Sequence, residues 1–220
     1  MFLGHLAVGF AAKKLAPKAS LGTLFVAAQF LDLLWPAFIL IGLEKVQIVP
    51  GITPVTPLDF IFYPFSHSLI AALGWSLLIG GAYFLIRRQP RESLVIGLAV
   101  LSHWVLDFAS HRPDLPLGIH SEFKVGLGLW FFRSATVAVE LTLLIIGCAV
   151  YARATQSKNK AGRFGFWILI GFLCVSYFAA VFGPPPPSVT AIGWAGQSMW
   201  LLVLWGYWLD RQRPLAVRIR

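Results

Sequence analysis

Three polar residues, His103, Asp107 and His111, follow one another at intervals of four in an otherwise apolar stretch. On an α-helix this spacing places them on one face, because each step of four residues drifts by only about 40°. Pro113 disfavours helical conformation at Arg112, so the stripe reaches the end of its helix. Imidazole nitrogens and carboxylate oxygens are ligands of Zn²⁺ and similar divalent ions. The stripe therefore predicts a metal site.

Few other ionisable residues lie inside apolar stretches, and they are His5, Asp32, His67, Arg133 and Glu140. An ionisable group within a membrane-spanning helix costs at least about 2.5 kcal/mol on insertion scales. Each of these residues therefore indicates a functional role or a charge partner. A single histidine in such a helix is commonly a hydrogen-bonded structural residue, so the metal prediction rests on the whole group.

The composition indicates a membrane protein. Of the 220 residues, 58% are hydrophobic and only 12% are charged, and the mean hydropathy is +0.75. Such values lie far outside soluble usage and exclude a nucleotide-binding or nucleic-acid-binding domain. We expect an all-α, polytopic integral membrane helical bundle, with residues 1–220 in a single transmembrane domain. The apolar segments lie at about 2–12, 20–43, 66–86, 93–109, 126–152, 164–183 and 189–209, which predicts about seven helices, the first one short.

Basic residues separate cleanly between alternate connections of this bundle. Fourteen of the eighteen lie on one side: Lys13, Lys14, Lys18, Arg87, Arg88, Arg91, Arg153, Lys158, Lys160, Arg163, Arg211, Arg213, Arg218 and Arg220. The opposite connections carry Lys45, Arg112 and Lys124. By the positive-inside rule the C-terminus is cytoplasmic and the N-terminus non-cytoplasmic. The net charge of +9 thus reflects topology, not affinity for nucleic acid.

This topology places five polar residues at a similar depth, in the non-cytoplasmic half or near the middle of the bilayer: His5, Asp32, His67, His103 and Asp107. Leaving each of them alone in lipid is unfavourable. We therefore expect them to converge in one cavity that opens to the non-cytoplasmic face.

Four short elements carry a family resemblance: Gly4-His5; Leu31-Asp32 followed by Pro36; Phe65-Ser66-His67-Ser68; and Leu101-Ser102-His103 followed by Asp107. Together they resemble the membrane-bound metal-dependent hydrolase family of bacterial inner-membrane proteins. The resemblance covers residues 1–118, whereas residues 119–220 carry no recognised motif. It implies that His5, Asp32, His67, His103 and Asp107 are metal ligands or close neighbours of the metal, in an enzyme of the bacterial inner membrane.

The chain also departs from that family. A second carboxylate expected at position 34 is replaced by Leu34, and a His-Arg-Gly element is missing near residues 62–64. These losses favour a site with one metal ion over a site with two. The ion we expect is Zn²⁺. His111 and Asp114 are candidates to replace the missing groups, so the resemblance is to a divergent member.

Further roles follow from the residue types. Asp114 is a candidate catalytic proton acceptor, and Asp32 is a second candidate if it does not bind the metal. The forked donors of Arg112 suit an anionic substrate group. Arg133 and Glu140 are seven residues apart and so share a helical face, which suggests charge pairing or substrate contact.

Three functions remain open from the sequence. The first is a membrane metal-dependent hydrolase acting on a small, lipid-linked or amphipathic substrate. The second is a small permease or ion-coupled transporter, and the third is a non-enzymatic membrane protein with a structural or degenerate metal site. The partners expected in all three are the lipid bilayer and no nucleic acid, and the oligomeric state stays open.

Overall fold

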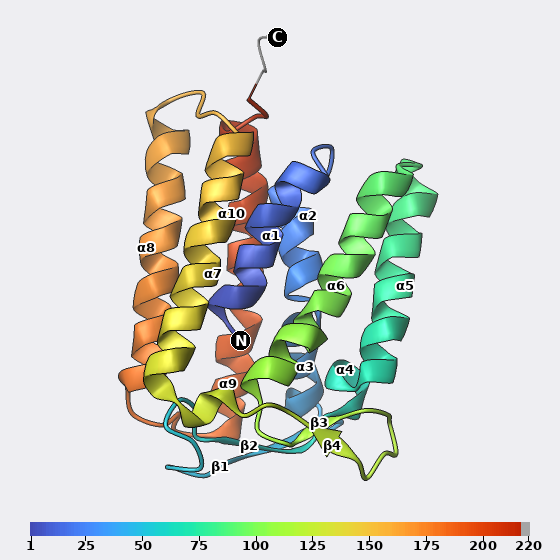
Figure 1. The fold of residues 1–220 in the computed structure, drawn as a ribbon, viewed down its shortest axis with the longest axis vertical. Coiled ribbons are helices and arrows are strands. Elements are labelled where there is room, and N and C mark those ends of the chain that lie inside the picture. The colour runs from blue at the N-terminus through green and yellow to red at the C-terminus, as the bar shows by residue number, and fades with distance from the viewer. Residues whose placement is uncertain (217–220) are drawn as a thin grey trace.

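The computed structural model describes residues 1–216 and is predominantly helical (Figure 1). Its helices are α1 (Leu3–Leu15), α2 (Leu21–Ala28), α3 (Phe30–Leu40), α4 (Pro64–His67), α5 (Leu69–Arg87), α6 (Pro90–Ser110), α7 (Arg133–Ala154), α8 (Lys160–Phe182), α9 (Val189–Gln197) and α10 (Met199–Gln212), with a 3-10 turn η1 (Leu129–Phe131). Its strands are β1 (Lys45–Ile48), β2 (Leu58–Phe62), β3 (Leu115–Pro116) and β4 (Lys124–Val125). Two of the basic residues counted above, Arg218 and Arg220, lie outside the described part.

Four helices, α5, α6, α7 and α8, are long and apolar enough to cross a membrane, and a fifth span results if α2 and α3 count as one. Their outward faces are apolar, with Leu77, Ile86 and Val175 at least 70% exposed. Such faces suit contact with lipid, because large apolar patches are rare on soluble monomers.

Two of the seven expected helices are each divided in the structure. Residues 20–43 form α2 and α3, which are bent by 59° at Gln29, and residues 189–209 form α9 and α10. At the first break the Ala28 carbonyl accepts a hydrogen bond from the His103 ring, and a side chain inserted into a helical ladder is a recognised cause of kinks.

The short helix α1 lies at the centre of the bundle. Leu3, Leu6 and Phe10 are fully buried there, as is typical of a helix that is apolar all round. Its backbone packs closely on α7, where a Cβ added to Gly147 would lie 2.4 Å from the Ala7 carbonyl oxygen. Small residues at such contacts let membrane helices approach one another. Helix α1 is therefore packed among α2, α6 and α7, and only its C-terminal residues Lys14 and Leu15 are exposed.

The two ends of the bundle differ. The C-terminal ends of α1 and α10, the α5–α6 turn and the α7–α8 connection gather at one end, and these are the basic segments (Figure 1). At the opposite end lie two small antiparallel sheets, β1 with β2 and β3 with β4. The all-α prediction is therefore correct for the bundle but missed these sheets, because short strands in polar, proline-rich loops carry little periodic signal.

Candidate metal centre

Five residues from four helices form a His/Asp cluster inside the bundle: His5 from α1, Asp32 from α3, His67 from the end of α4, and His103 and Asp107 from α6. The three histidines and Asp107 are at most 3% exposed. The Asp32 side chain is 28% exposed and is the member that reaches open space. The structure thus brings together residues that are up to 102 positions apart.

Two carboxylates bracket the Nε2 atoms of His67 and His103. Asp32 Oδ1 lies 3.4 Å from His67 Nε2, and Asp32 Oδ2 lies 3.6 Å from His103 Nε2. Asp107 Oδ2 lies 3.7 Å from His67 Nε2 and 3.2 Å from His103 Nε2. Ligand atoms around a tetrahedral ion with bonds of about 2.0–2.1 Å are about 3.3 Å apart. These four side chains could therefore hold one metal ion.

His103 directs a bare nitrogen toward this point. Its Nδ1 lies 2.8 Å from the Ala28 carbonyl oxygen, which only accepts, so Nδ1 carries a proton. Its Nε2 is buried and has no hydrogen-bond partner among residues 1–216, although two carboxylates lie nearby. A buried nitrogen beside carboxylates is unfavourable unless a proton or a metal cation joins them. The poor hydrogen-bond geometry favours the metal.

His67 is oriented in the same way by a relay through Ser66. Ser66 Oγ donates to Glu44 Oε2 at 2.6 Å and lies 2.7 Å from His67 Nδ1. Because the hydroxyl has one proton, Oγ accepts from Nδ1, and His67 Nε2 is left to face Asp32 and Asp107. Metal-binding histidines commonly donate their second ring N–H to such a partner.

Besides Tyr63, sequence reasoning missed Glu44, which completes the relay to His67. It is 2% exposed and also accepts hydrogen bonds from the backbone N–H groups of Phe65 and Ser66, both at 2.8 Å. Burial raises the pKa of its carboxyl group, and the hydrogen bonds from Ser66 act against that shift. The available signal was scarcity, because the chain has only nine carboxylate side chains and Glu44 is the only one between Asp32 and Asp59.

His111, the third member of the predicted stripe, lies at the edge of the cluster. Its Nε2 is 4.0 Å from Asp107 Oδ1, whereas its Nδ1 lies 2.9 Å from Asp114 Oδ1. Asp114 also accepts a hydrogen bond from the Tyr63 hydroxyl at 3.3 Å. Burial acts to raise the pKa of Asp114, but the hydrogen bonds from His111 and from Arg112 outweigh it and hold that pKa low. Asp114 therefore positions His111, and its role as a catalytic proton acceptor stays a prediction.

Two of the guanidinium nitrogens of Arg112 bind carboxylates of the protein. Its guanidinium binds Asp59 and donates from Nε to Asp114 Oδ2 at 2.9 Å. Both carboxylates lie within the protein, and the binding of an anionic substrate group by Arg112 stays a prediction. Arg112 fastens the loop after α6 to strand β2.

Arg133 and Glu140 each have a partner on another element, and the predicted charge compensation or substrate contact stays a prediction. Glu140 is 2% exposed and accepts from the backbone N–H groups of Leu3 at 2.6 Å and Gly4 at 3.1 Å, so it caps α1. Arg133 is exposed at the first turn of α7, where it donates to the Pro54 carbonyl oxygen. Two helical turns place the two side chains about 10 Å apart along the axis, one at the membrane edge and one inside.

The other half of the cluster is occupied by the chain itself. The Met1 amino nitrogen donates to Asp107 Oδ1 at 2.5 Å and lies 3.0 Å from His5 Nε2. His5 stacks on His103, with ring centroids 3.5 Å apart. The N-terminus, expected at the non-cytoplasmic surface, is thus buried within the bundle. A cation already faces Asp107 Oδ1, which leaves Oδ2 for an ion between Asp32, His67 and His103.

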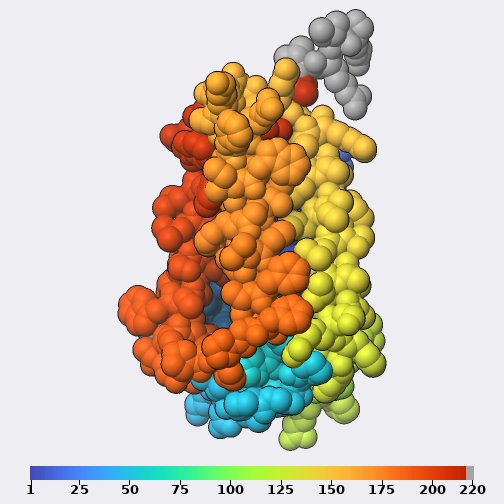
Figure 2. Space-filling view, turned by 90° about the vertical axis from the view of Figure 1, so that its left-hand side faces the viewer, coloured from blue at the N-terminus to red at the C-terminus, as the bar shows by residue number. Residues whose placement is uncertain are grey.

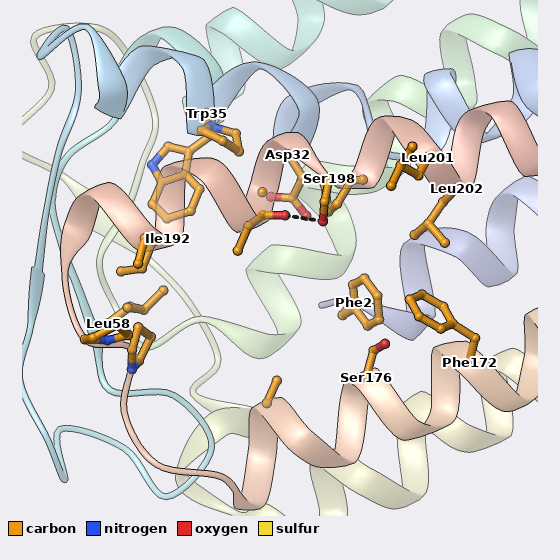
Figure 3. Close-up of a pocket in the computed structure, with 18 of the residues that line it drawn as sticks. Phe2, Asp32, Trp35, Leu58, Phe172, Ser176, Ile192, Ser198, Leu201 and Leu202 are labelled. Carbon is orange, nitrogen blue, oxygen red and sulfur yellow. Dashed lines mark hydrogen bonds between the residues drawn. The ribbon is translucent and has the colours of Figure 1, made fainter.

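A cavity of about 780 Å³ adjoins the cluster at Asp32. It is lined mainly by apolar side chains of α3, α8, α9 and α10, and Figure 3 shows the Asp32 carboxylate among Phe2, Trp35, Ile192, Leu202 and Phe172. This volume is within the range of about 300–1,000 Å³ that is usual for ligand pockets. The cluster therefore has one accessible side, and it faces an apolar space.

Comparisons with protein-family models, with curated proteins and with solved structures find no match for this chain. The resemblance to the membrane-bound metal-dependent hydrolase family stays a prediction that rests on the residues quoted above.

Proposed function

We propose that the protein is a membrane metal-dependent hydrolase that uses one divalent ion. The preferred candidate is Zn²⁺, held by Asp32, His67, His103 and Asp107. His5 and His111 then lie beside the ion without binding it directly. The observation that carries the proposal is the set of four spacings of 3.2–3.7 Å between two imidazole nitrogens and two carboxylates.

The charge of this ligand set supports the proposal. Two neutral imidazoles and two carboxylates balance a divalent cation, which is tolerable in a region of low dielectric constant where a bare cation is not. Both histidines have their second nitrogen engaged, by Ala28 and by Ser66. Such outer partners fix the ring orientation of a metal ligand.

The accessible side of the cluster supports an enzymatic role over a structural one. A closed structural site surrounds its ion with protein ligands, whereas a catalytic site keeps one position open. A bound divalent ion supplies polarisation of the scissile bond and lowers the pKa of water. Water would reach the ion from the cavity as a ligand added to the four side chains, and the exposed Asp32 carboxylate would be placed to accept its proton.

We further propose that the protein resides in a bacterial inner membrane with the basic end of the bundle in the cytoplasm. The gathering of basic segments at one end supports this orientation. The cluster, built partly on α3 and α4, then lies in the non-cytoplasmic half.

Metal content of the detergent-purified protein tests the proposal. We expect about one divalent ion per chain in the wild type, none in His103→Ala, and an unchanged amount in His120→Ala, which removes an exposed histidine. A wild type that carries no metal after chelator-free purification, and gains none from added zinc, manganese or iron, would contradict it.

The bent pair α2–α3 favours a second candidate, a small ion-coupled transporter. Discontinuous helices commonly carry the ion sites of transporters, and Asp32 lies in the first turn of α3. Proteoliposome uptake of radioactive zinc that disappears in Asp32→Asn would favour this candidate over hydrolysis.

A further inference from the structure

The cavity beside Asp32 is polar at one place, next to Asp32, and apolar over most of the rest of its wall. Asp32 is the only charged residue among the described residues that line it, and Ser176 and Ser198 are the only others with polar side-chain groups apart from the ring nitrogens of its tryptophans. The Ser198 hydroxyl already donates to the Ala195 carbonyl oxygen at 2.6 Å (Figure 3). The space therefore suits a hydrocarbon chain and leaves one polar contact, at Asp32 and the cluster behind it.

The cavity is open on the side of the bundle. Figure 2 shows a hollow between α8 and the α9–α10 segment, with blue atoms of the N-terminal part of the chain at its floor, consistent with α3 lining the cavity. Phe172 of α8 is 50% exposed and Leu201 of α10 is 65% exposed, and both line the cavity. Because these faces are those that suit lipid contact, a chain from the bilayer enters sideways and does not need to cross water.

The proline-rich turn after α8 borders the cavity at the end away from the basic connections. Pro186 and Pro187 line it there, and a proline has no N–H group that would need a partner. This turn therefore borders an apolar ligand without leaving an unsatisfied donor of its own at these two residues.

The charge of the lining restricts the polar group of the ligand. No lysine or arginine lines the cavity within residues 1–216, and the carboxylates at its polar end balance one divalent ion. A phosphate placed there would be a buried anion without a partner, which is strongly unfavourable. An ester or amide carbonyl is uncharged and escapes this penalty.

We infer that the cavity binds the acyl chain of a membrane lipid, with the uncharged ester carbonyl of that lipid beside Asp32. This inference rests on the proposed hydrolase function and names its substrate class as an acyl ester. In the reaction, the oxygen of one water molecule bonds to the carbonyl carbon and the ester C–O bond breaks. One proton of that water goes to the leaving alcohol, and the fatty acid departs with the other.

Photolabelling of the detergent-purified full chain tests the inference. The probe is palmitic acid methyl ester with a diazirine on its chain, and labelled peptides are located by mass spectrometry. We expect labels in α3, α8, α9 and α10 at the cavity, and competition by an alkyl phosphate at least about tenfold weaker than by the unlabelled ester.

Two tryptophan substitutions provide a matched pair. Ala180→Trp fills the cavity from α8, whereas Ala179→Trp places the same indole next to it, at an exposed residue that does not line the cavity. We expect labelling at α9 and α10 to fall about tenfold in Ala180→Trp, because an indole displaces several methylene groups, and to be unchanged in Ala179→Trp. Ala195→Trp repeats the test from α9, and thermal stability and metal content show that each variant is folded.

The outcomes separate this inference from the proposed function. Labels spread evenly over the exposed helices, or unchanged in both Ala180→Trp and Ala195→Trp, would overturn the acyl-chain site whatever the metal content. Stronger competition by the alkyl phosphate would overturn the ester. Labelling at the cavity in His103→Ala without metal supports the chain site and leaves the metal measurements to decide hydrolysis.

Discussion

The two halves of the chain contribute different parts of the candidate site: one provides the His/Asp cluster and the other most of the wall of the adjoining cavity. Residues 1–118 provide every member of the His/Asp cluster and the Glu44–Ser66 relay, whereas residues 119–220 provide most of the apolar cavity wall and Glu140. The cluster depends on a few polar atoms held at fixed distances, whereas the cavity depends on shape alone. A polar site can therefore be lost through one atom, while an apolar pocket is lost mainly by filling it.

The largest effect on metal binding is expected from substitution of Asp107, which lies in the half that provides the cluster. Asp107→Asn removes a carboxylate placed between two histidines, so stoichiometric metal should be lost. Asp114→Asn is the matched control, because Asp114 contacts His111 and not the four proposed ligands, and it should retain the ion. Metal analysis of both proteins checks this. Equal loss in the two variants would make His111 a ligand and move the site toward it.

The relay to His67 should give the next largest effect. Glu44→Gln and Ser66→Ala leave every proposed ligand in place but free the His67 ring, and outer-shell changes typically weaken metal binding by about 10–100-fold. Competition with a chelator of known affinity measures the change. Glu122→Gln alters an exposed loop carboxylate and should have no effect. Unchanged affinity in both relay variants would show that His67 does not bind the metal.

Glu140 tests whether residues 119–220 stabilise the helix that carries His5. Glu140→Leu leaves the Leu3 and Gly4 N–H groups without their acceptor, which should lower the free energy of unfolding by about 1–3 kcal/mol. Glu140→Gln keeps an acceptor oxygen and should recover most of that loss. Thermal unfolding in detergent checks both, and metal content should stay stoichiometric. Loss of metal in the folded Glu140→Gln variant would instead place Glu140 in the site.

The smallest effect is expected at Arg133. Arg133→Ala removes hydrogen bonds to Pro54 and a contact with the Phe182 ring, both at the surface, and should change stability by no more than about 1 kcal/mol. The same unfolding measurement serves here. A loss as large as that of Glu140→Leu would show that Arg133 supports the fold beyond these surface contacts.

Much of the cluster could be predicted because ionisable residues are rare in the long apolar segments of this chain. His5, Asp32, His67, His103 and Asp107 stand out in apolar segments, where an ionisable side chain is unfavourable without a partner. Glu44 and Tyr63 could not be recognised in this way, because they lie in connections where polar side chains are ordinary. Their importance comes from burial, which only the folded chain creates.

The helices, like the site residues, were predicted only in part from the sequence. The helices α5 to α8 lie close to the expected segments, since long apolar runs specify helices in a bilayer. The break between α2 and α3 was not expected, because residues 20–43 form one predominantly apolar segment and the His103 ring that binds the Ala28 carbonyl comes from a distant helix. The apolar cavity was equally hidden, because a residue that lines it has the same character as one that faces lipid.

The sequence by itself determined the helical bundle, the separation of basic segments and the residue types of a metal centre, because each of these follows from side-chain polarity and local periodicity. The tertiary structure alone decided which atoms meet: His67 and His103 between two carboxylates, Asp114 on His111, Glu140 on α1 and an apolar cavity beside Asp32. Those contacts join residues far apart in the chain, and their distances depend on how whole helices pack, which no local pattern encodes.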